Sequence, residues 1–388
     1  MRLLFAYRRV LLLPALLAAV LAGASRELIG LCGPFTDVAE DAFCPFVLEI
    51  FYLGITTGTT ATTYDPAGNV TRLQMAAFLS RTVDGVLKRG RRRAALNRFW
   101  STRNDAAIDV TTVGLFSKLP ASDGTDVWVP SQNDGTVARV HASDGALLGT
   151  WTGGLFPDAA LSAMGKIFIA ADTAPSRLHR IDPREPAGAM TTVATTSGNF
   201  ALSIAFDGWR IWMPESFGSV SIVTPSASLP WTATTITAGF TTPVGILFDG
   251  SSMWVTDQGP GTLLKLDLNG TVLQTVTVGS GVEHPAFDGA NIWVPNTNSG
   301  TVSVVRASNG AVLATLTGNG LSGPYMAAFD GERILVTNQL GPSVSLFKAA
   351  DLTPISSVST GTASLPQGVC SDGLDFWIVI HNNQLARF

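Results

Sequence analysis

The dipeptide Glu283-His284 is the strongest candidate for chemistry in this sequence of 388 residues. A carboxylate beside an imidazole can act as a general base and acid, and the two groups can also bind a divalent cation. The pair stands directly before Pro285, where a short apolar segment begins. A single Glu-His pair is also compatible with no catalytic role, so catalysis here is a hypothesis. We predict no cofactor, and a divalent cation is the ligand that the pair would suit.

A set of polar side chains recurs at equivalent places in a repeated sequence unit. Their neutral or acidic character suits a sugar, a peptide or a cation as ligand. Asn, Asp and Ser also stabilise turns through their own backbone, so a purely structural role stays open. The set interpreted as a ligand-binding rim comprises Asn133, Asp134, Asp172, Glu215, Asp257, Gln258, Asn296, Asn298, Asn338, His381 and Asn382, with Ser131, Gln132 and Gln339 beside them.

Other chemistries lack the residues that they need. The histidines His141, His179 and His381 belong to different units, and no Cys/His spacing indicates zinc. No Ser-His-Asp order, nucleotide-binding loop or EF-hand spacing occurs in a supporting context. The formal net charge of −4 argues against nucleic acid as a partner. The sequence therefore favours a binding protein and leaves the question of an enzyme open.

The repeated unit that positions these side chains is clearest in residues Phe287–Gly318. The β-branched and aromatic run Ile292–Val294 follows the tight-turn pair Asp288-Gly289, and two further short runs follow. With the strand that enters the Asp-Gly turn, the unit contains four short strands in about forty residues. This pattern is typical of a β-propeller blade.

The number of Asp-Gly turns predicts the number of blades. Its copies, with Met164-Gly165 in second place, lie 39 to 43 residues apart, which predicts seven blades. One large apolar residue follows each turn, and we interpret these residues as packing between blades rather than as a ligand box. The turns begin at Asp123, Met164, Asp207, Asp249, Asp288, Asp330 and Asp372, and the apolar residues are Trp128, Phe168, Trp212, Trp254, Trp293, Leu335 and Trp377.

The seventh unit has three strands before the sequence ends. The missing piece is found near the front, where Ile108–Gly114 resembles the fourth strand Leu273–Gly279 of another unit. We expect this N-terminal strand to complete the last blade, which would protect edges that otherwise invite aggregation.

The first 24 residues predict a secretory signal peptide. Arg2, Arg8 and Arg9 supply the positive region, Val10–Leu21 the apolar region, and Ala22-Gly23-Ala24 the cleavage site. We therefore expect an extracytoplasmic protein, secreted to the cell surface or envelope, with no transmembrane segment in the mature chain.

Export places the three cysteines in an oxidising setting. Cys32 and Cys44 are close in sequence and can form a disulfide, although the sequence does not decide whether they are paired. Cys370 lies in a predicted strand and is interpreted as a small buried hydrophobic residue.

Residues 35–89 contain ordered short motifs. Thr71 and Gln74 fit a helix capping box. The stretch resembles an S-layer homology (SLH) module, which implies non-covalent attachment to a cell-envelope glycan, with Arg72 as a candidate contact. A helical cap on a secreted protein is the alternative interpretation. The motifs that carry the resemblance are Phe35-x-Asp37-Val38, Leu53–Gly58, Tyr64-x-Pro66 and Val70–Arg81.

The segment Lys88–Arg103 is strongly basic. It suits attraction to an anionic envelope polymer, and it also suits a solvated connector. The predicted domains are a signal peptide (1–24), an SLH-like helical module (25–89), a basic linker or helix (90–107) and the propeller (108–388).

The pattern Phe-Asp-Gly-x-x-(Ile/Met)-Trp-Val-x-(Asn/Asp) is seen at Phe248–Asp257 and Phe287–Asn296. In this pattern the ring resembles secreted propellers with YVTN or NHL repeats and, more distantly, virginiamycin B lyase. The lyase resemblance would imply a metal-assisted elimination, but no catalytic role is carried over to a residue here. We expect a mainly β protein in which the SLH-like module binds an envelope glycan or a surface protein and the propeller recognises a ligand. A lyase or a lactonase-type hydrolase at the channel mouth is the alternative.

Overall fold

The computed structural model describes residues 35–39, 44, 47, 50–51, 56–60, 62–72, 74–79, 109–361, 365–380 and 383–388. The chain forms two compact units, residues 1–92 and 93–388, and each is described by itself. The predicted signal peptide, the predicted basic linker and Cys32 lie outside the described residues. Within the described ranges, no helix is long and apolar enough to cross a membrane.

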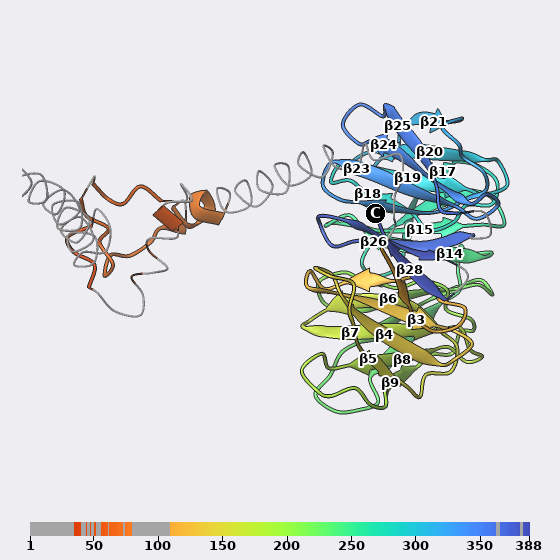
Figure 1. The fold of residues 1–388 in the computed structure, drawn as a ribbon, viewed down its shortest axis with the longest axis horizontal. Coiled ribbons are helices and arrows are strands. Elements are labelled where there is room, and N and C mark those ends of the chain that lie inside the picture. The colour runs from red at the N-terminus through yellow and green to blue at the C-terminus, as the bar shows by residue number, and fades with distance from the viewer. Residues whose placement is uncertain are drawn as a thin grey trace, which may run out of the picture. The chain divides into compact units, whose positions relative to one another are not determined.

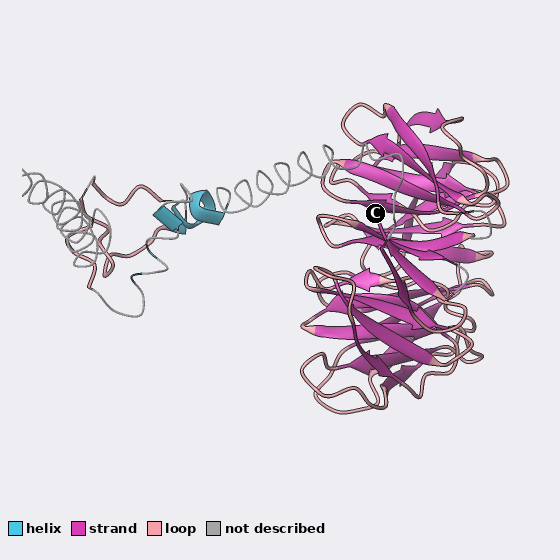
Figure 2. Ribbon diagram, in the orientation of Figure 1, coloured by secondary structure: helices cyan, strands magenta, loops and turns pink. Residues whose placement is uncertain are grey.

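Seven four-stranded antiparallel sheets build the second unit, and Figure 1 shows them in colours that run from yellow to blue. Strands joined by loops make up its described part (Figure 2). The predicted seven-bladed β-propeller is thereby confirmed. The first six blades are β2 (Ala121–Ser122) to β5 (Leu147–Trp151), β6 (Pro157–Ala163) to β9 (Thr191–Thr195), β10 (Ala205–Phe206) to β13 (Thr232–Ile236), β14 (Pro243–Phe248) to β17 (Val272–Thr277), β18 (Ala286–Phe287) to β21 (Val312–Leu316) and β22 (Pro324–Phe329) to β25 (Pro354–Ser359).

The strands between these bounds are β3 (Asp126–Ser131), β4 (Thr136–His141), β7 (Lys166–Ala171), β8 (Arg177–Ile181), β11 (Ile211–Glu215), β12 (Ser219–Thr224), β15 (Met253–Asp257), β16 (Thr262–Leu266), β19 (Asn291–Asn296), β20 (Thr301–Arg306), β23 (Arg333–Asn338) and β24 (Ser343–Lys348).

The seventh blade closes the ring with strands from both ends of the unit. It comprises β26 (Pro366–Ser371), β27 (Phe376–Ile380), β28 (Gln384–Arg387) and the N-terminal strand β1 (Asp109–Thr112). Strand β1 pairs antiparallel with β28, from Asp109 opposite Arg387 to Thr112 opposite Gln384. The predicted closure is therefore confirmed, and the backbone groups of β28 are paired on both sides.

A hydrogen bond between the aspartate of the turn and the indole of the next strand ties each such turn to the core. In the fourth blade, Asp249 Oδ2 accepts a bond from Trp254 Nε1 at 2.7 Å, and its Oδ1 accepts from the backbone N–H groups of Ser251 and Ser252. This bond explains why an aspartate and a tryptophan recur five residues apart. The same indole bond joins Asp123 to Trp128, Asp207 to Trp212, Asp288 to Trp293 and Asp372 to Trp377.

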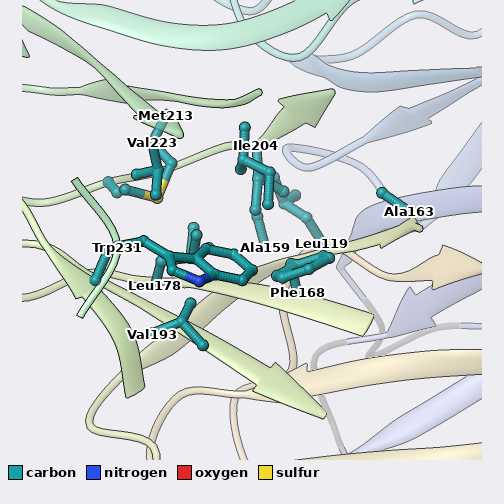
Figure 3. Close-up of a cluster of buried hydrophobic side chains, with 14 residues drawn as sticks. Leu119, Ala159, Ala163, Phe168, Leu178, Val193, Ile204, Met213, Val223 and Trp231 are labelled. Atoms are coloured by element: carbon teal, nitrogen blue, oxygen red, sulfur yellow. The ribbon is translucent and has the colours of Figure 1, made fainter. Parts of the chain in front are cut away.

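The apolar core lies between neighbouring blades. Figure 3 shows one cluster, in which Trp231 packs near Phe168 with ring centroids 5.7 Å apart, beside Leu178 and Val193. The five repeated tryptophans and Phe168 are almost completely buried. They pack as the sequence analysis predicts, as core rather than as an aromatic ligand box.

The first unit is built around Phe35, which is fully buried and packs against the rings of Phe51 and Tyr64. The predicted capping box is present: the Thr71 N–H donates to Gln74 Oε1 at 2.8 Å and the Gln74 N–H donates to Thr71 Oγ1 at 3.2 Å. Residues 72 and 74–79 are helical. Cys44 takes part in a disulfide, but its proposed partner lies outside the described residues, so that pairing stays a prediction.

Candidate functional site

The inner strands bring polar residues from several blades to one level of the central channel. Lys118 and Glu283 occupy equivalent places, because each donates its backbone N–H to the carbonyl of a proline in the second strand of its blade. The residue after Lys118 donates its N–H to the carbonyl of Asp158, and the residue after Glu283 donates to that of Tyr325. We call Lys118, Asp158, Glu283 and Tyr325 the channel-mouth layer.

The predicted pair Glu283 and His284 lies in and directly below this layer, and both side chains are buried. Glu283 Oε2 lies 3.9 Å from His284 Nε2, while Glu283 Oε1 accepts a hydrogen bond of 2.8 Å from Gln258 Nε2. Burial raises the pKa of Glu283 to about 8, against the opposing effects of Gln258 and Lys118. Burial, with the charge of Lys118, lowers the pKa of His284 to about 3. At neutral pH the acid is therefore protonated and the imidazole neutral.

Two further carboxyl groups stand on the opposite side of the layer, in the second blade. Burial raises the pKa of Asp158 to about 7 and also raises that of Asp172. Gln132 Nε2 donates to Asp172 Oδ2 at 2.7 Å and reaches Asp158 Oδ1 at 3.5 Å. Lys118 is the cation whose charge acts on Asp158, Asp172 and Glu283.

A cavity of about 90 Å³ lies below the layer, at the centre of the ring. Its walls come from the innermost segments of six blades, and His284 is the titratable residue among them. The Nδ1 atom of His284 is buried and has no hydrogen-bond partner among the described residues. Such a site can bind a small group that offers a hydrogen bond to His284 Nδ1. No group of three or more potential metal ligands is found in the described part of the chain.

Four of the predicted rim residues lie inside the blades rather than on the surface. Glu215 is fully buried, and its carboxylate accepts bonds from three hydroxyl groups. Asp257 accepts two backbone N–H groups of the preceding loop. Asn296 and Asn338 each donate to two hydroxyl groups of the adjacent strand. Burial places these four residues inside the blades, where their hydrogen bonds stabilise strands and loops, while Asn296 Oδ1 is buried without a partner among the described residues. Their role in ligand binding stays a prediction.

The other predicted rim residues are nearer the surface. Asn133, Asp134 and Asn298 are exposed, although Asp134 already accepts the N–H of Leu115. Asp172 and Gln258 are half-buried and belong to the site around the channel-mouth layer. His381 and Asn382 lie outside the described residues, and their prediction stays open.

The two remaining described histidines lie in outer parts of their blades. His141 is bonded to Asp126, which raises its pKa, and His179 is buried with its pKa lowered to about 4 by burial. Neither is grouped with His284.

Lys118, Asp158 and Tyr325 were missed by sequence reasoning, although a signal for them exists. Lys118, Glu283 and Tyr325 each stand five residues before the aspartate of their turn. In the second blade a register shift between Pro157 and Ala159 moves Asp158 into that place. Counting back from each turn would have found the layer, except for the bulge, which the sequence does not show.

Comparison with known proteins supports the division into two kinds of unit. Residues 34–76 match the S-layer homology domain model. The propeller resembles a catalytically inactive variant of virginiamycin B lyase from Staphylococcus aureus with quinupristin, at 13% identity over 73% of this chain and 96% of that chain, with a TM-score of 0.59. It also resembles Kuenenia stuttgartiensis hydrazine synthase, at 15% identity over 73% and 98%, with a TM-score of 0.60.

The WD40 β-propeller domain of Doa1 gives a third likeness, at 15% identity over 73% of this chain and 93% of that chain, with a TM-score of 0.57. At these identities the likeness shows the propeller fold alone. No curated protein sequence matches this chain significantly.

Proposed function

We propose that this protein is held at the cell envelope by its S-layer homology domain and uses the propeller to bind a ligand there. The observation that carries the proposal is the presence of an SLH match at residues 34–76 in the same chain as a ring with a polar channel mouth. The coarser part follows directly from the domain, since SLH domains suggest association with cell-envelope polymers. The wall glycan as the polymer and Arg72 as a contact are our proposals.

The position of Arg72 supports its assignment. It is exposed and follows Thr71, whose capping box with Gln74 fixes the start of the helix. The guanidinium of Arg72 therefore stands near a helix N-terminus, where the backbone N–H groups also favour an anionic group. An anionic envelope glycan would contact both the guanidinium of Arg72 and these backbone N–H groups.

The anchoring proposal is tested by cosedimentation of the purified full chain with cell-wall fragments. We expect Arg72→Ala to reduce the bound fraction severalfold at low salt. Arg184→Ala is the matched control, because Arg184 is an exposed arginine of the propeller. Equal retention of the Arg72→Ala variant and the wild type would refute the role of Arg72. Failure of the wild type to bind wall fragments would refute anchoring.

Acid–base catalysis at the channel mouth is the second candidate function. Its support is the pair of neighbouring groups whose pKa values are driven apart, Glu283 to about 8 and His284 to about 3. A protonated Glu283 can donate a proton and a neutral His284 can accept one. A panel of lactones and cyclic depsipeptides tests for turnover that is lost in His284→Gln and that declines above about pH 8, as Glu283 ionises. Absence of turnover across the panel would leave binding as the function of the site.

A further inference from the structure

Three phenylalanines at equivalent places in the first three blades have a backbone conformation that favours glycine. Phe116, Phe156 and Phe200 have φ angles of 58°, 46° and 63°. Each carbonyl accepts the N–H of the residue that follows the second strand of its blade. In the fifth and sixth blades the same place is occupied by Gly281 and Gly323, with φ angles of 68° and 59°. We call the three residues the phenylalanine row.

A bulky residue in this left-handed region is strained, and glycine would remove the strain. The phenylalanine row consists of side chains that the backbone conformation of the turn disfavours, and these side chains are not buried in the core. Phe156 is 51% exposed, and the ring of Phe200 packs on Phe217, which is 74% exposed. Exposed Leu115 and Leu155 precede the first two members of the row. An apolar surface therefore borders the channel on the side of the first three blades.

The phenylalanine row adjoins the carboxyl groups of the candidate site. Phe116 stands two residues before Lys118, and Phe156 stands two residues before Asp158. The carbonyl of Phe156 also accepts the N–H of Asp172. Moving inward along each inner strand, the chain thus passes from the row to the channel-mouth layer and then to the cavity. The Lys118 ammonium already lies 4.3 Å from the centroid of the Phe116 ring, which is an ammonium–aromatic contact.

Two buried polar atoms near the channel-mouth layer have no hydrogen-bond partner among the described residues. His284 is 3% exposed, lines the cavity and leaves its Nδ1 unpartnered. Gln367 Oε1 is also buried and unpartnered, in the seventh blade, five residues before Asp372. The other ring nitrogen of His284, Nε2, lies 3.9 Å from Glu283 Oε2. A ligand that donates hydrogen bonds would satisfy the two unpartnered atoms, His284 Nδ1 and Gln367 Oε1.

We propose that the channel mouth binds a primary ammonium group that carries an apolar substituent. The ammonium group occupies the channel-mouth layer beside Asp158, and a bound cation favours the ionised form of that carboxyl group. The protonated Glu283 offers its carbonyl oxygen as a further acceptor. The apolar substituent lies against the phenylalanine row, on the outer side of the channel-mouth layer. This inference rests on the proposed ligand-binding role of the propeller and names the ligand class of that role.

Isothermal titration of the purified full chain with 2-phenylethylamine tests the proposal. The neutral probe 2-phenylethanol and the anionic probe 3-phenylpropionate have similar apolar parts and differ in charge. We expect the amine to bind at least about tenfold more tightly than either, since charge-assisted and cation–π contacts are specific to it. Equal binding of the alcohol would overturn the ammonium assignment. No binding of the amine at millimolar concentration would overturn the proposal as a whole.

Two variants assign the binding to this place. Asp158→Asn keeps the shape of the side chain and removes its charge, and we expect it to weaken binding of the amine about tenfold with little effect on the alcohol. Phe156→Gly removes one member of the row, and we expect binding of the amine to weaken about fivefold while the melting temperature is unchanged or raised, because the strain at its φ of 46° is relieved.

Met164→Gly is the matched control for Phe156→Gly. Met164 lies in the turn between β6 and β7 of the same blade, at a φ of 52° and 46% exposed, away from the channel-mouth layer. It should relieve similar strain and leave amine binding unchanged. Amine binding that is unaffected by both Asp158→Asn and Phe156→Gly would refute the proposed place. Because titration needs no cell wall, its failure is distinguishable from failure of the wall-retention assay.

Discussion

The substitution Asp249→Asn tests whether the bond from turn to tryptophan stabilises the blade. The hydrogen-bond partners of this carboxylate are donors: Oδ1 accepts from the N–H groups of Ser251 and Ser252 and from the Ser251 hydroxyl, and Oδ2 accepts from Trp254 Nε1. An amide of the same shape has one acceptor oxygen. In either orientation its NH₂ group faces an N–H donor, and Trp254 or the two backbone groups lose their partner.

The expected loss of stability follows from the strength of one hydrogen bond to a charged group. Such a bond contributes about 1.5–3 kcal/mol to the free energy of unfolding when it is buried. Trp254 is fully buried, but Asp249 is partly exposed, so solvent screening places the expected loss near the lower end, at about 1.5–2 kcal/mol. For a unit of this size the melting temperature should fall by roughly 3–8 °C.

Thermal unfolding monitored by circular dichroism at pH 7 measures this loss. Asp144→Asn is the control, because Asp144 is exposed and accepts one backbone N–H, which an amide oxygen can also do. We expect the control to change the melting temperature by less than 2 °C. An Asp249→Asn variant as stable as the wild type would refute the view that the repeated Asp–Trp pair is a stabilising contact.

The same pair predicts a pH dependence. The bonds from Trp254, Ser251 and Ser252 outweigh burial and lower the pKa of Asp249 below its usual value of 3.8. The stability that depends on its ionisation is therefore present above that usual value and is lost as the pH falls through the lower, folded-state value. The difference between wild type and Asp249→Asn should be largest near neutral pH and should shrink below about pH 4.

Three further predictions concern other buried groups. Gly198→Ala should lower the melting temperature by several degrees, because its Cβ would overlap the buried carboxylate of Glu215. Gly188→Ala should not, because its Cβ would make only an ordinary contact of 3.8 Å with the carbonyl of Pro186. The wild type should lose stability relative to Glu283→Gln as the pH rises from about 4.5 to about 8, because the pKa of Glu283 is raised to about 8 on folding; parallel pH profiles would contradict this. Cys370, whose thiol pKa is raised by burial, should react with a thiol reagent at pH 8 only after denaturation.

The fold could be predicted from sequence because each blade repeats the same local requirement. The turn before Trp254 needs an aspartate for its backbone bonds and a glycine at φ 93°, so Asp-Gly and Trp recur together. The closure of the ring was predictable for the same reason, since β1 repeats the pattern of an outer strand. Local chemistry of this kind is visible in a single sequence.

The candidate site was predictable only in part, because its members come from strands that are far apart in the chain. Glu283 and His284 were found through their residue types. Glu215 and Asn296 were expected on the rim because polar residues stand at the end of the second strand, but their partners, hydroxyl groups of the adjacent strand, keep them inside. Burial is a property of the packed ring, and residue type alone does not determine it.

The departures from the repeat indicate where the ring differs from a pure scaffold. A turn that is glycine in two blades and phenylalanine in three others, with φ between 46° and 68°, cannot be explained by the folding of that turn, because glycine meets its requirement at lower cost. Phe116, Phe156 and Phe200 also stand on consecutive blades, next to Asp158 and Asp172. In the fourth blade Thr242 holds this place without a positive φ, so the strained phenylalanines are confined to one side of the ring, as contact with a ligand would require. The strained phenylalanines and the neighbouring carboxyl groups therefore have the distribution that a ligand site requires, and the repeat itself does not account for it.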